Sequence, residues 1–285
     1  MKVYISVDME GISGLVRWPD VASSGIDFER NRGLMTLDTN AAISGAFAAG
    51  ATEVVVEENH GVEDLCVLDM TLIDPRCRVI RGAGRPGATT MAGLSSEVGV
   101  VLLVGHHGRA GSFPGIMAHT ISYGGFRLVR LAGQAIGEPD FFARRAGELG
   151  VPIGMVSGDQ VVAEQVQALC PWAEAVIVKI ALGNQSADCI PPARAREMIR
   201  AGAERTVARA LAGELEVCTD IGGPYEFEVE LRKAAPEAMR QNLESLDGFE
   251  LVADNLVRVT APDMDLGFRR VAYLGYADRP GVTRH

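Results

Sequence analysis

KVYISV at Lys2–Val7 and TEVVVE at Thr52–Glu57 are short apolar runs, separated by a long amphipathic stretch at Phe28–Ala49. Runs of this length are typical of strands, whereas the stretch between them has the length of a helix. Asp27 is a suitable N-cap, and Gly50 follows the end of the stretch as glycine often does at helix C-termini. The segment therefore predicts a βαβ unit, whose two strands lie parallel in one sheet.

The same alternation continues along the chain. Gly99–Val104 is the most apolar of the later runs and predicts the most deeply buried strand. We also expect strands at Cys77–Arg81, Pro152–Val156 and Ala175–Lys179, a hairpin at Phe126–Ile136, and helices at Pro139–Leu149 and Gln160–Leu169. Together these elements predict an α/β fold with a doubly wound, mainly parallel sheet.

The sequence pattern changes near residue 190. A long helix is expected from Pro192 to Leu211. Strand-like segments follow at Glu216–Thr219, Glu226–Leu231, Glu250–Ala253 and Leu256–Val259. We therefore expect a catalytic α/β domain over residues 1–190 and a smaller α+β domain over residues 191–285, which contributes to assembly or substrate access.

Composition limits the class of protein. The chain has 285 residues, of which 47% are hydrophobic and 22% charged, as in an ordinary globular enzyme. Its longest apolar run, Val98–Gly105, is far shorter than the roughly 18 residues of a membrane-spanning helix. The net charge of −10 opposes binding to nucleic acid, so neither membrane nor nucleic acid is an expected partner.

Cysteine usage and the start of the chain indicate the compartment. The five cysteines are odd in number and scattered, and none forms a CxxC pair. A disulfide framework and a thiolate metal site are therefore not expected. Acidic residues at Asp8 and Glu10 interrupt the chain before any apolar segment reaches signal-peptide length. We expect a cytoplasmic protein.

Potential metal ligands follow the predicted strands. Asp8 and Glu10 come directly after the first strand, His60 after the second, and His106 and His107 after the buried strand. Because the carboxyl ends of parallel strands meet at one edge of a sheet, these side chains are expected to share a crevice. Carboxylate and imidazole ligands without thiolate suit a catalytic zinc or manganese site. The pattern alone does not choose between the two adjacent histidines.

Five motifs in their order resemble the D-aminopeptidase family of dizinc peptidases (peptidase family M55). They are VDMEGISG at Val7–Gly14, NH at Asn59–His60, GHHGRAG at Gly105–Gly111, PGIMAHT at Pro114–Thr120 and IGE at Ile136–Glu138. The resemblance is close over about the first 190 residues and looser beyond them.

The resemblance implies a role for each residue of the site. The family's metal ligands fall on Asp8, Glu10, His60, His107 and Glu138, which would hold two divalent ions, with zinc the expected metal. Its active-site histidine falls on His119, and His106 becomes a neighbour of the ligands. Asp8 is the carboxylate expected to be shared by both ions.

The resemblance also implies an activity. We expect a metal-dependent aminopeptidase that hydrolyses short peptides, with a D-amino acid at the amino terminus, through a water activated by two ions. The family's architecture implies a homo-oligomer, a decamer of two pentameric rings. Two alternatives stay open: a metallo-amidohydrolase acting on a non-peptide amide, and a non-catalytic metal-binding scaffold.

Two departures from the family pattern bear on the substrate. Glu58-Asn59 precedes His60 where many relatives have Asp-Ser or Asp-Gly, so the support of that ligand is expected to differ. Gly183-Asn184 stands where relatives commonly have an arginine, which removes a guanidinium that could hold a carboxylate.

Overall fold

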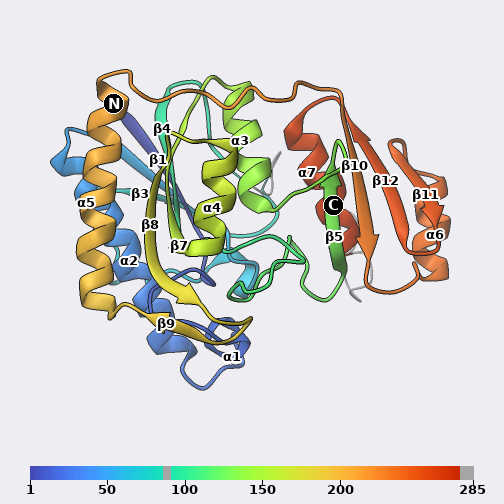
Figure 1. The fold of residues 1–285 in the computed structure, drawn as a ribbon, viewed down its shortest axis with the longest axis horizontal. Coiled ribbons are helices and arrows are strands. Elements are labelled where there is room, and N and C mark those ends of the chain that lie inside the picture. The colour runs from blue at the N-terminus through green and yellow to red at the C-terminus, as the bar shows by residue number, and fades with distance from the viewer. Residues whose placement is uncertain (86–90, 277–285) are drawn as a thin grey trace.

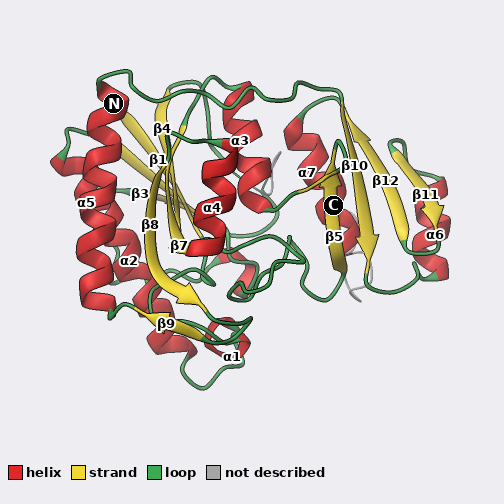
Figure 2. Ribbon diagram, viewed as in Figure 1, coloured by secondary structure: helices red, strands yellow, loops and turns green. Residues whose placement is uncertain are grey.

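The computed structural model describes residues 1–85 and 91–276, which form two separate sheets (Figures 1 and 2). The first sheet has the strand order β3-β2-β1-β4-β7-β8-β9 and is parallel except for β9 at its edge. Its strands are β1 (Lys2–Val7), β2 (Glu53–Glu58), β3 (Arg78–Ile80), β4 (Val98–Val104), β7 (Ile153–Asp159), β8 (Glu174–Ala181) and β9 (Ala187–Cys189). The predicted α/β fold with a mainly parallel sheet is confirmed.

Helices cover both faces of this sheet. In Figure 1, α2 (Phe28–Ala48) and α5 (Pro192–Leu211) lie to its left, and α3 (Glu138–Glu148) and α4 (Gln160–Leu169) lie to its right. α2 and α5 pack against each other, because the glycine at Gly45 lets the α5 backbone come close. Two short helical segments, α1 (Trp18–Val21) and η1 (Glu63–Leu65), follow β1 and β2. Among the described helices, none combines the length and apolar character needed to cross a bilayer.

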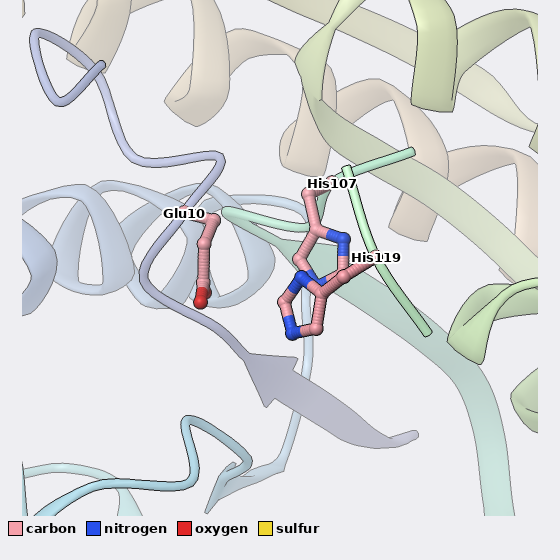
Figure 3. Close-up of side chains that lie close together, drawn as sticks. All are labelled: Glu10, His107 and His119. Atoms are coloured by element: carbon pink, nitrogen blue, oxygen red, sulfur yellow. The ribbon is translucent and has the colours of Figure 1, made fainter. Parts of the chain in front are cut away.

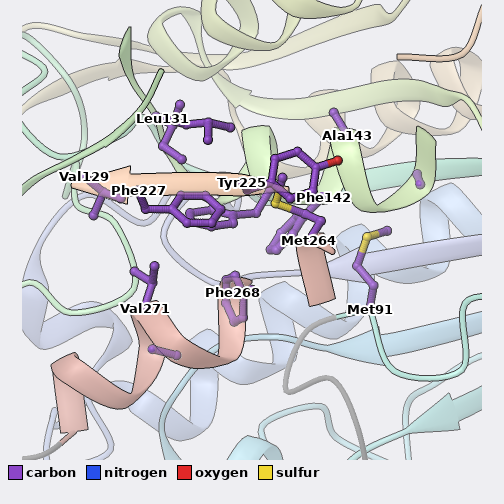
Figure 4. Packing of buried hydrophobic residues seen from close by; sticks show 14 of the residues in the cluster. Met91, Val129, Leu131, Phe142, Ala143, Tyr225, Phe227, Met264, Phe268 and Val271 are labelled. Carbon is purple, nitrogen blue, oxygen red and sulfur yellow. The ribbon is translucent and has the colours of Figure 1, made fainter. Parts of the chain in front are cut away.

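The second sheet is antiparallel and has the strand order β11-β12-β10-β5-β6. It consists of β5 (Phe126–Leu131), β6 (Gln134–Ala135), β10 (Tyr225–Leu231), β11 (Phe249–Ala253) and β12 (Leu256–Ala261), and α6 (Glu237–Glu244) and α7 (Met264–Tyr276) pack against it. Figure 4 shows the core between the layers, where Phe268 of α7 lies close to Phe142 of α3. Phe227 of β10 stacks on Phe141 of α3, with ring centroids 5.2 Å apart.

The layers do not follow the predicted division at residue 190. β5 and β6 precede that position but belong to the second sheet, and α5 follows it but packs on the first. The reason is packing: α5 buries Ile199 and Ala203 in the core of the first sheet. The predicted strand at Glu216–Thr219 is also wrong, since these residues form an irregular connection.

The register of the first sheet brings the ends of its central strands level. Val7, the last residue of β1, pairs with Glu58 at the end of β2 and with Val104 at the end of β4. The residues that come next therefore leave the sheet at the same edge. This edge is where open α/β sheets bind their ligands.

Candidate metal centre and its cavity

Five of the predicted ligands lie together at this edge, and all are buried: Asp8, Glu10, His60, His107 and Glu138. Their ligand atoms form two groupings that could each hold a metal ion, Asp8-Glu10-His60 and Asp8-His107-Glu138. Within each grouping the atoms lie within 4.8 Å of one another. Asp8 belongs to both, which is the arrangement expected of a carboxylate shared by two ions.

The first grouping is held by short contacts around His60. Its Nδ1 lies 3.3 Å from Oδ1 of Asp8 and 3.0 Å from Oε2 of Glu10. Its Nε2 lies 2.9 Å from the carbonyl oxygen of Val21, so this nitrogen carries the hydrogen and donates. Nδ1 thereby faces the two carboxylates, where its lone pair would be available to an ion.

The second grouping is oriented in the same way around His107. Its Nδ1 donates to the carbonyl oxygen of Gly108 at 3.0 Å. Its Nε2 lies 3.3 Å from Oδ2 of Asp8 and 3.6 Å from Oε1 of Glu138. Metal-binding histidines commonly donate their other ring nitrogen to a carbonyl, which fixes the ring and its tautomer. The donor set therefore fits two divalent ions.

The electrostatics of the cluster also favour cations. Three carboxylates are buried together, and buried charges need partners of opposite sign. Burial alone would lower the pKa of the His107 imidazole, but the charge of Glu138 and the contacts with Asp8 raise it to about 10. Burial alone would likewise raise the pKa of Asp8, but hydrogen bonds from His107 and His60 hold it well below its usual value. Without an ion, protons on the imidazoles balance these carboxylates.

His119 lies beside the second grouping. Its ring stacks on that of His107 with centroids 4.1 Å apart, and Glu10 reaches toward the pair from the segment after β1 (Figure 3). Nδ1 of His119 donates to the carbonyl oxygen of Met117 at 2.9 Å, which leaves Nε2 free to accept a proton. Burial and the neighbouring His107 lower the pKa of His119, so its imidazole is neutral at pH 7.

His119 also belongs to a third grouping, Glu10-His107-His119. Its Nε2 is 4.0 Å from Oε1 of Glu138. Unlike His107, it lines the large cavity described below. The geometry thus sets His119 beside the ligand groupings and on the wall of the cavity where a substrate would lie.

His106, the other member of the adjacent pair, is turned away from the groupings. Its Nε2 donates to the carbonyl oxygen of Ser6 at 3.3 Å, and its ring packs edge-on against Phe142. Nδ1 comes no nearer than 3.9 Å to Oδ2 of Asp8. Among the residues that the structure describes, His106 enters none of the three groupings. The geometry therefore favours His107 as the ligand.

Glu138 is the candidate ligand with the weakest signal in the sequence. It is the first residue of α3, where the positive end of the helix dipole favours a carboxylate. Its Oε1 accepts a hydrogen bond of 2.6 Å from the backbone N–H of Ile121. The sequence predicts the helix start at Pro139, but it does not predict that the loop before β5, which contains Ile121, lies against Glu138.

A cavity of about 830 Å³ opens beside the cluster. Asp8, Glu10, His60, His119 and Glu138 form part of its lining. Other parts come from β10, α6 and α7 of the second-sheet layer, through Leu231, Met239, Phe268 and Leu274. A cavity of this size is in the range of small-molecule sites and joins the candidate metal centre to an apolar wall.

Two aromatic residues that no sequence motif singles out also line the cavity. Trp18 of α1 packs edge-on against His119 with ring centroids 5.5 Å apart. The ring centroids of Trp18 and Tyr123 are 4.2 Å apart. Trp18 follows β1, whereas Tyr123 precedes β5 of the second sheet. The pair bridges the two layers next to His119.

The two departures from the family pattern have different surroundings. Asn59 lines the cavity and donates from Nδ2 to the hydroxyl oxygen of Ser6 at 3.3 Å. Asn184 donates to the carbonyl oxygen of Gly115 at 3.1 Å and so joins two loops. Since Asn184 is not part of the cavity lining, only the change at Asn59 adjoins the candidate site directly.

Comparison with known proteins identifies the family of the chain. A family model described as D-aminopeptidase matches residues 1–272. The D-aminopeptidase of Bacillus subtilis (strain 168) is 34% identical over 199 residues, which is 70% of this chain and 71% of that protein. A solved structure, the Zn-dependent D-aminopeptidase DppA from Bacillus subtilis, a self-compartmentalizing protease, superposes with a TM-score of 0.85 at 28% identity and covers 98% of this chain and 99% of its own.

Proposed function

The chain belongs to the D-aminopeptidase family and is a metal-dependent aminopeptidase, and from that premise we propose that it removes amino-terminal D residues from short peptides. We propose Asp8, Glu10, His60, His107 and Glu138 as ligands of two divalent ions, with zinc as the metal because the similar Bacillus structure is Zn-dependent. The observation that carries the proposal is that Asp8 lies in both ligand groupings, beside a substrate-sized cavity.

The bound ions would supply Lewis-acid polarisation of the scissile carbonyl and lower the pKa of water. His119 supplies the proton transfers. Its neutral Nε2 takes a proton from the attacking water and later returns it to the amine nitrogen released when the C–N bond breaks. Stacking on His107 and the edge of Trp18 hold the ring in place for both steps.

The second-sheet layer has a proposed role in substrate access. Met239 of α6 and Phe268 and Leu274 of α7 give the cavity apolar surface away from the ligand cluster. Lys233, an exposed residue after β10, adds a positive charge to the same lining. These features suit a short peptide with a free carboxylate better than a folded protein chain.

We also propose that the chain assembles into a homo-oligomer, a decamer of two pentameric rings, in the cytoplasm. Support for assembly comes from the similar Bacillus protease, which is self-compartmentalizing. Phe113 and Leu182 add to this support because both are large apolar side chains that are mostly exposed. Their loops are joined by a hydrogen bond from the Gly115 N–H to the Gly183 carbonyl.

Paired substrates test the proposed activity. Peptides of D-Ala and of L-Ala with the same length and free termini are compared by kcat/KM on the metal-loaded protein. We expect the D series to be preferred. Equal or faster hydrolysis of the L series would reject the stereochemical proposal, and hydrolysis of non-peptide amides alone would favour the amidohydrolase alternative.

A further inference from the structure

A buried lysine reaches the segment that carries two of the proposed ligands. Lys179 lies on β8 within the apolar run VIVKIA and is almost completely buried. Its Nζ lies 2.7 Å from the carbonyl oxygen of Glu10, 2.9 Å from that of Ile12 and 2.5 Å from that of Leu15. An ammonium group has three N–H donors, so all of them are used on this one segment.

Burying the ammonium group of Lys179 costs free energy, so the hydrogen bonds that it makes must compensate. Taking a lysine out of water disfavours its charged form, and the charge of Asp159 nearby opposes this effect only in part, so that the pKa of Lys179 is lowered to about 8. The compensation is found in the segment after β1, where three carbonyl oxygens accept hydrogen bonds from the Lys179 ammonium group. Those carbonyls belong to irregular backbone outside any strand or helix, where that of Ile12 also accepts a turn hydrogen bond from the Leu15 N–H at 3.2 Å.

Other contacts hold different parts of the same segment. The N–H of Gly11 donates to the carbonyl of Gly105 at 2.7 Å, and a side chain at Gly11 would collide with the carbonyl of His106. The N–H and hydroxyl of Ser13 both donate to the Asp38 carboxylate at 3.0 Å. Lys179 differs from these contacts because it bonds the backbone of a proposed ligand, Glu10.

We propose that Lys179 is a positioning residue that sets the place of the Glu10 carboxylate and thereby the affinity of the ion held by Asp8, Glu10 and His60. The ion held by Asp8, His107 and Glu138 depends on it much less, because His107 follows β4 and Glu138 begins α3. The inference rests on the proposed two-ion function. It predicts that removing Lys179 lowers the zinc affinity of one of the two ion sites selectively.

The test compares Lys179→Met with a matched control, Arg32→Met. Arg32 also donates to two backbone carbonyls, those of Val67 at 2.8 Å and Leu68 at 3.1 Å, in the stretch after η1, which holds no proposed ligand. Zinc dissociation constants are measured on the full-length proteins by competition with a chromophoric chelator, and folding is checked by circular dichroism. The unchanged protein measured alongside shows whether two zinc sites exist, so failure of the two-ion function is recognised separately.

We expect Lys179→Met to weaken one zinc site by about 10- to 100-fold, the scale seen when an outer partner of a metal ligand is removed, and to leave the other within about threefold. Arg32→Met should change neither site. Lys179→Gln, which keeps an N–H donor, should restore part of the lost affinity. A folded Lys179→Met protein that binds both ions normally, or equal weakening of both sites, would overturn the proposal. If neither Lys179 variant folds, the lysine serves the fold and the proposal is likewise rejected.

Discussion

The imidazoles of His107 and His119 are stacked, yet their free nitrogens have different surroundings. Nε2 of His107 is enclosed by Asp8 and Glu138, whereas His119 lines the cavity. We expect His107→Ala to lower the metal content, because one ion loses a ligand. His119→Ala should keep its metal and lose about 10²-fold or more in kcat/KM, the scale of a deleted proton-transfer group. Elemental analysis and kinetics on both folded variants check this.

His106→Ala is the control for that comparison. The ring of His106 is fully buried against Phe142, so its loss should reduce stability by about 1–3 kcal/mol while leaving the metal content per folded chain unchanged. A metal-depleted His106 variant would show that the wrong member of the pair was assigned. Loss of metal from the His119 variant, with retention in the His107 variant, would reverse the two roles.

Protonation of the same imidazoles gives a pH prediction. In the metal-free protein burial opposes the charged forms, but the carboxylates raise the pKa of His107 to about 10 and that of His60 well above its usual value. A histidine whose pKa is raised on folding stabilises the folded protein fully below about pH 6.5, its unfolded pKa. This stabilisation is lost as the pH rises through the folded pKa, which is about 10 for His107. The chelator-treated protein should therefore lose thermal stability between pH 7 and pH 10.

Stabilisation by zinc should increase as the pH rises, because zinc competes with these protons and binds more tightly as they leave. The rise in Tm on adding zinc should be larger at pH 9 than at pH 7. Thermal unfolding with and without zinc at the two pH values measures this. A zinc effect that shrinks as the pH rises would contradict the assignment of His60 and His107 as ligands.

At the scale of elements, the contact between α2 and α5 supports the sheet that carries the site. A side chain at Gly45 would collide with the carbonyl of Arg200, whereas one at Gly33 in the same helix would meet only Leu72, at 4.0 Å. Gly45→Ala should destabilise the protein by about 1–3 kcal/mol, because the two helices are forced apart. Gly33→Ala should instead stabilise it by about 0.5–1 kcal/mol. Denaturant unfolding distinguishes them, and equal effects would refute the close packing of α2 on α5.

Periodicity located the elements that are regular and locally encoded. The βαβ unit from Lys2 to Glu58, the hairpin of β5 and β6, and α4 all lie where the sequence predicts them, within a residue or two. It did not predict α7, because Gly267 and Gly275 weaken the helical pattern. Gly267 packs against the ring of Phe227, a long-range contact that no local signal contains.

The candidate site was predictable to the extent that its residues follow strands. Asp8, Glu10 and His60 could be placed from strand ends, and so could the pair His106-His107. Choosing His107 from that pair and selecting Glu138 required the family resemblance. Lys179 left one signal, a charged residue within the apolar run of β8, but the segment that it bonds lies more than 160 residues earlier in the chain. Such pairings depend on topology, which periodicity does not determine.

At the scale of the whole molecule, the cavity lies where the two sheets and their helices meet, and an assembly would further limit access to it. If the exposed pair Phe113 and Leu182 lies in a contact between subunits, Phe113→Asp should shift the mass in solution toward smaller species. Light scattering coupled to gel filtration checks this, with Ile26→Asp as a control at a fully exposed apolar side chain. An unchanged mass for Phe113→Asp would remove this residue from the proposed interface.

The number of divalent ions bound per folded chain tests the account most directly, because the ligands, the shared Asp8 and the role of Lys179 all depend on it. Elemental analysis of protein supplemented with zinc, manganese or cobalt and then freed of excess ion gives this number. We expect close to two ions per chain, with activity lost as they are withdrawn and regained when they return. A value that stays near zero or one after supplementation would contradict the two-ion centre.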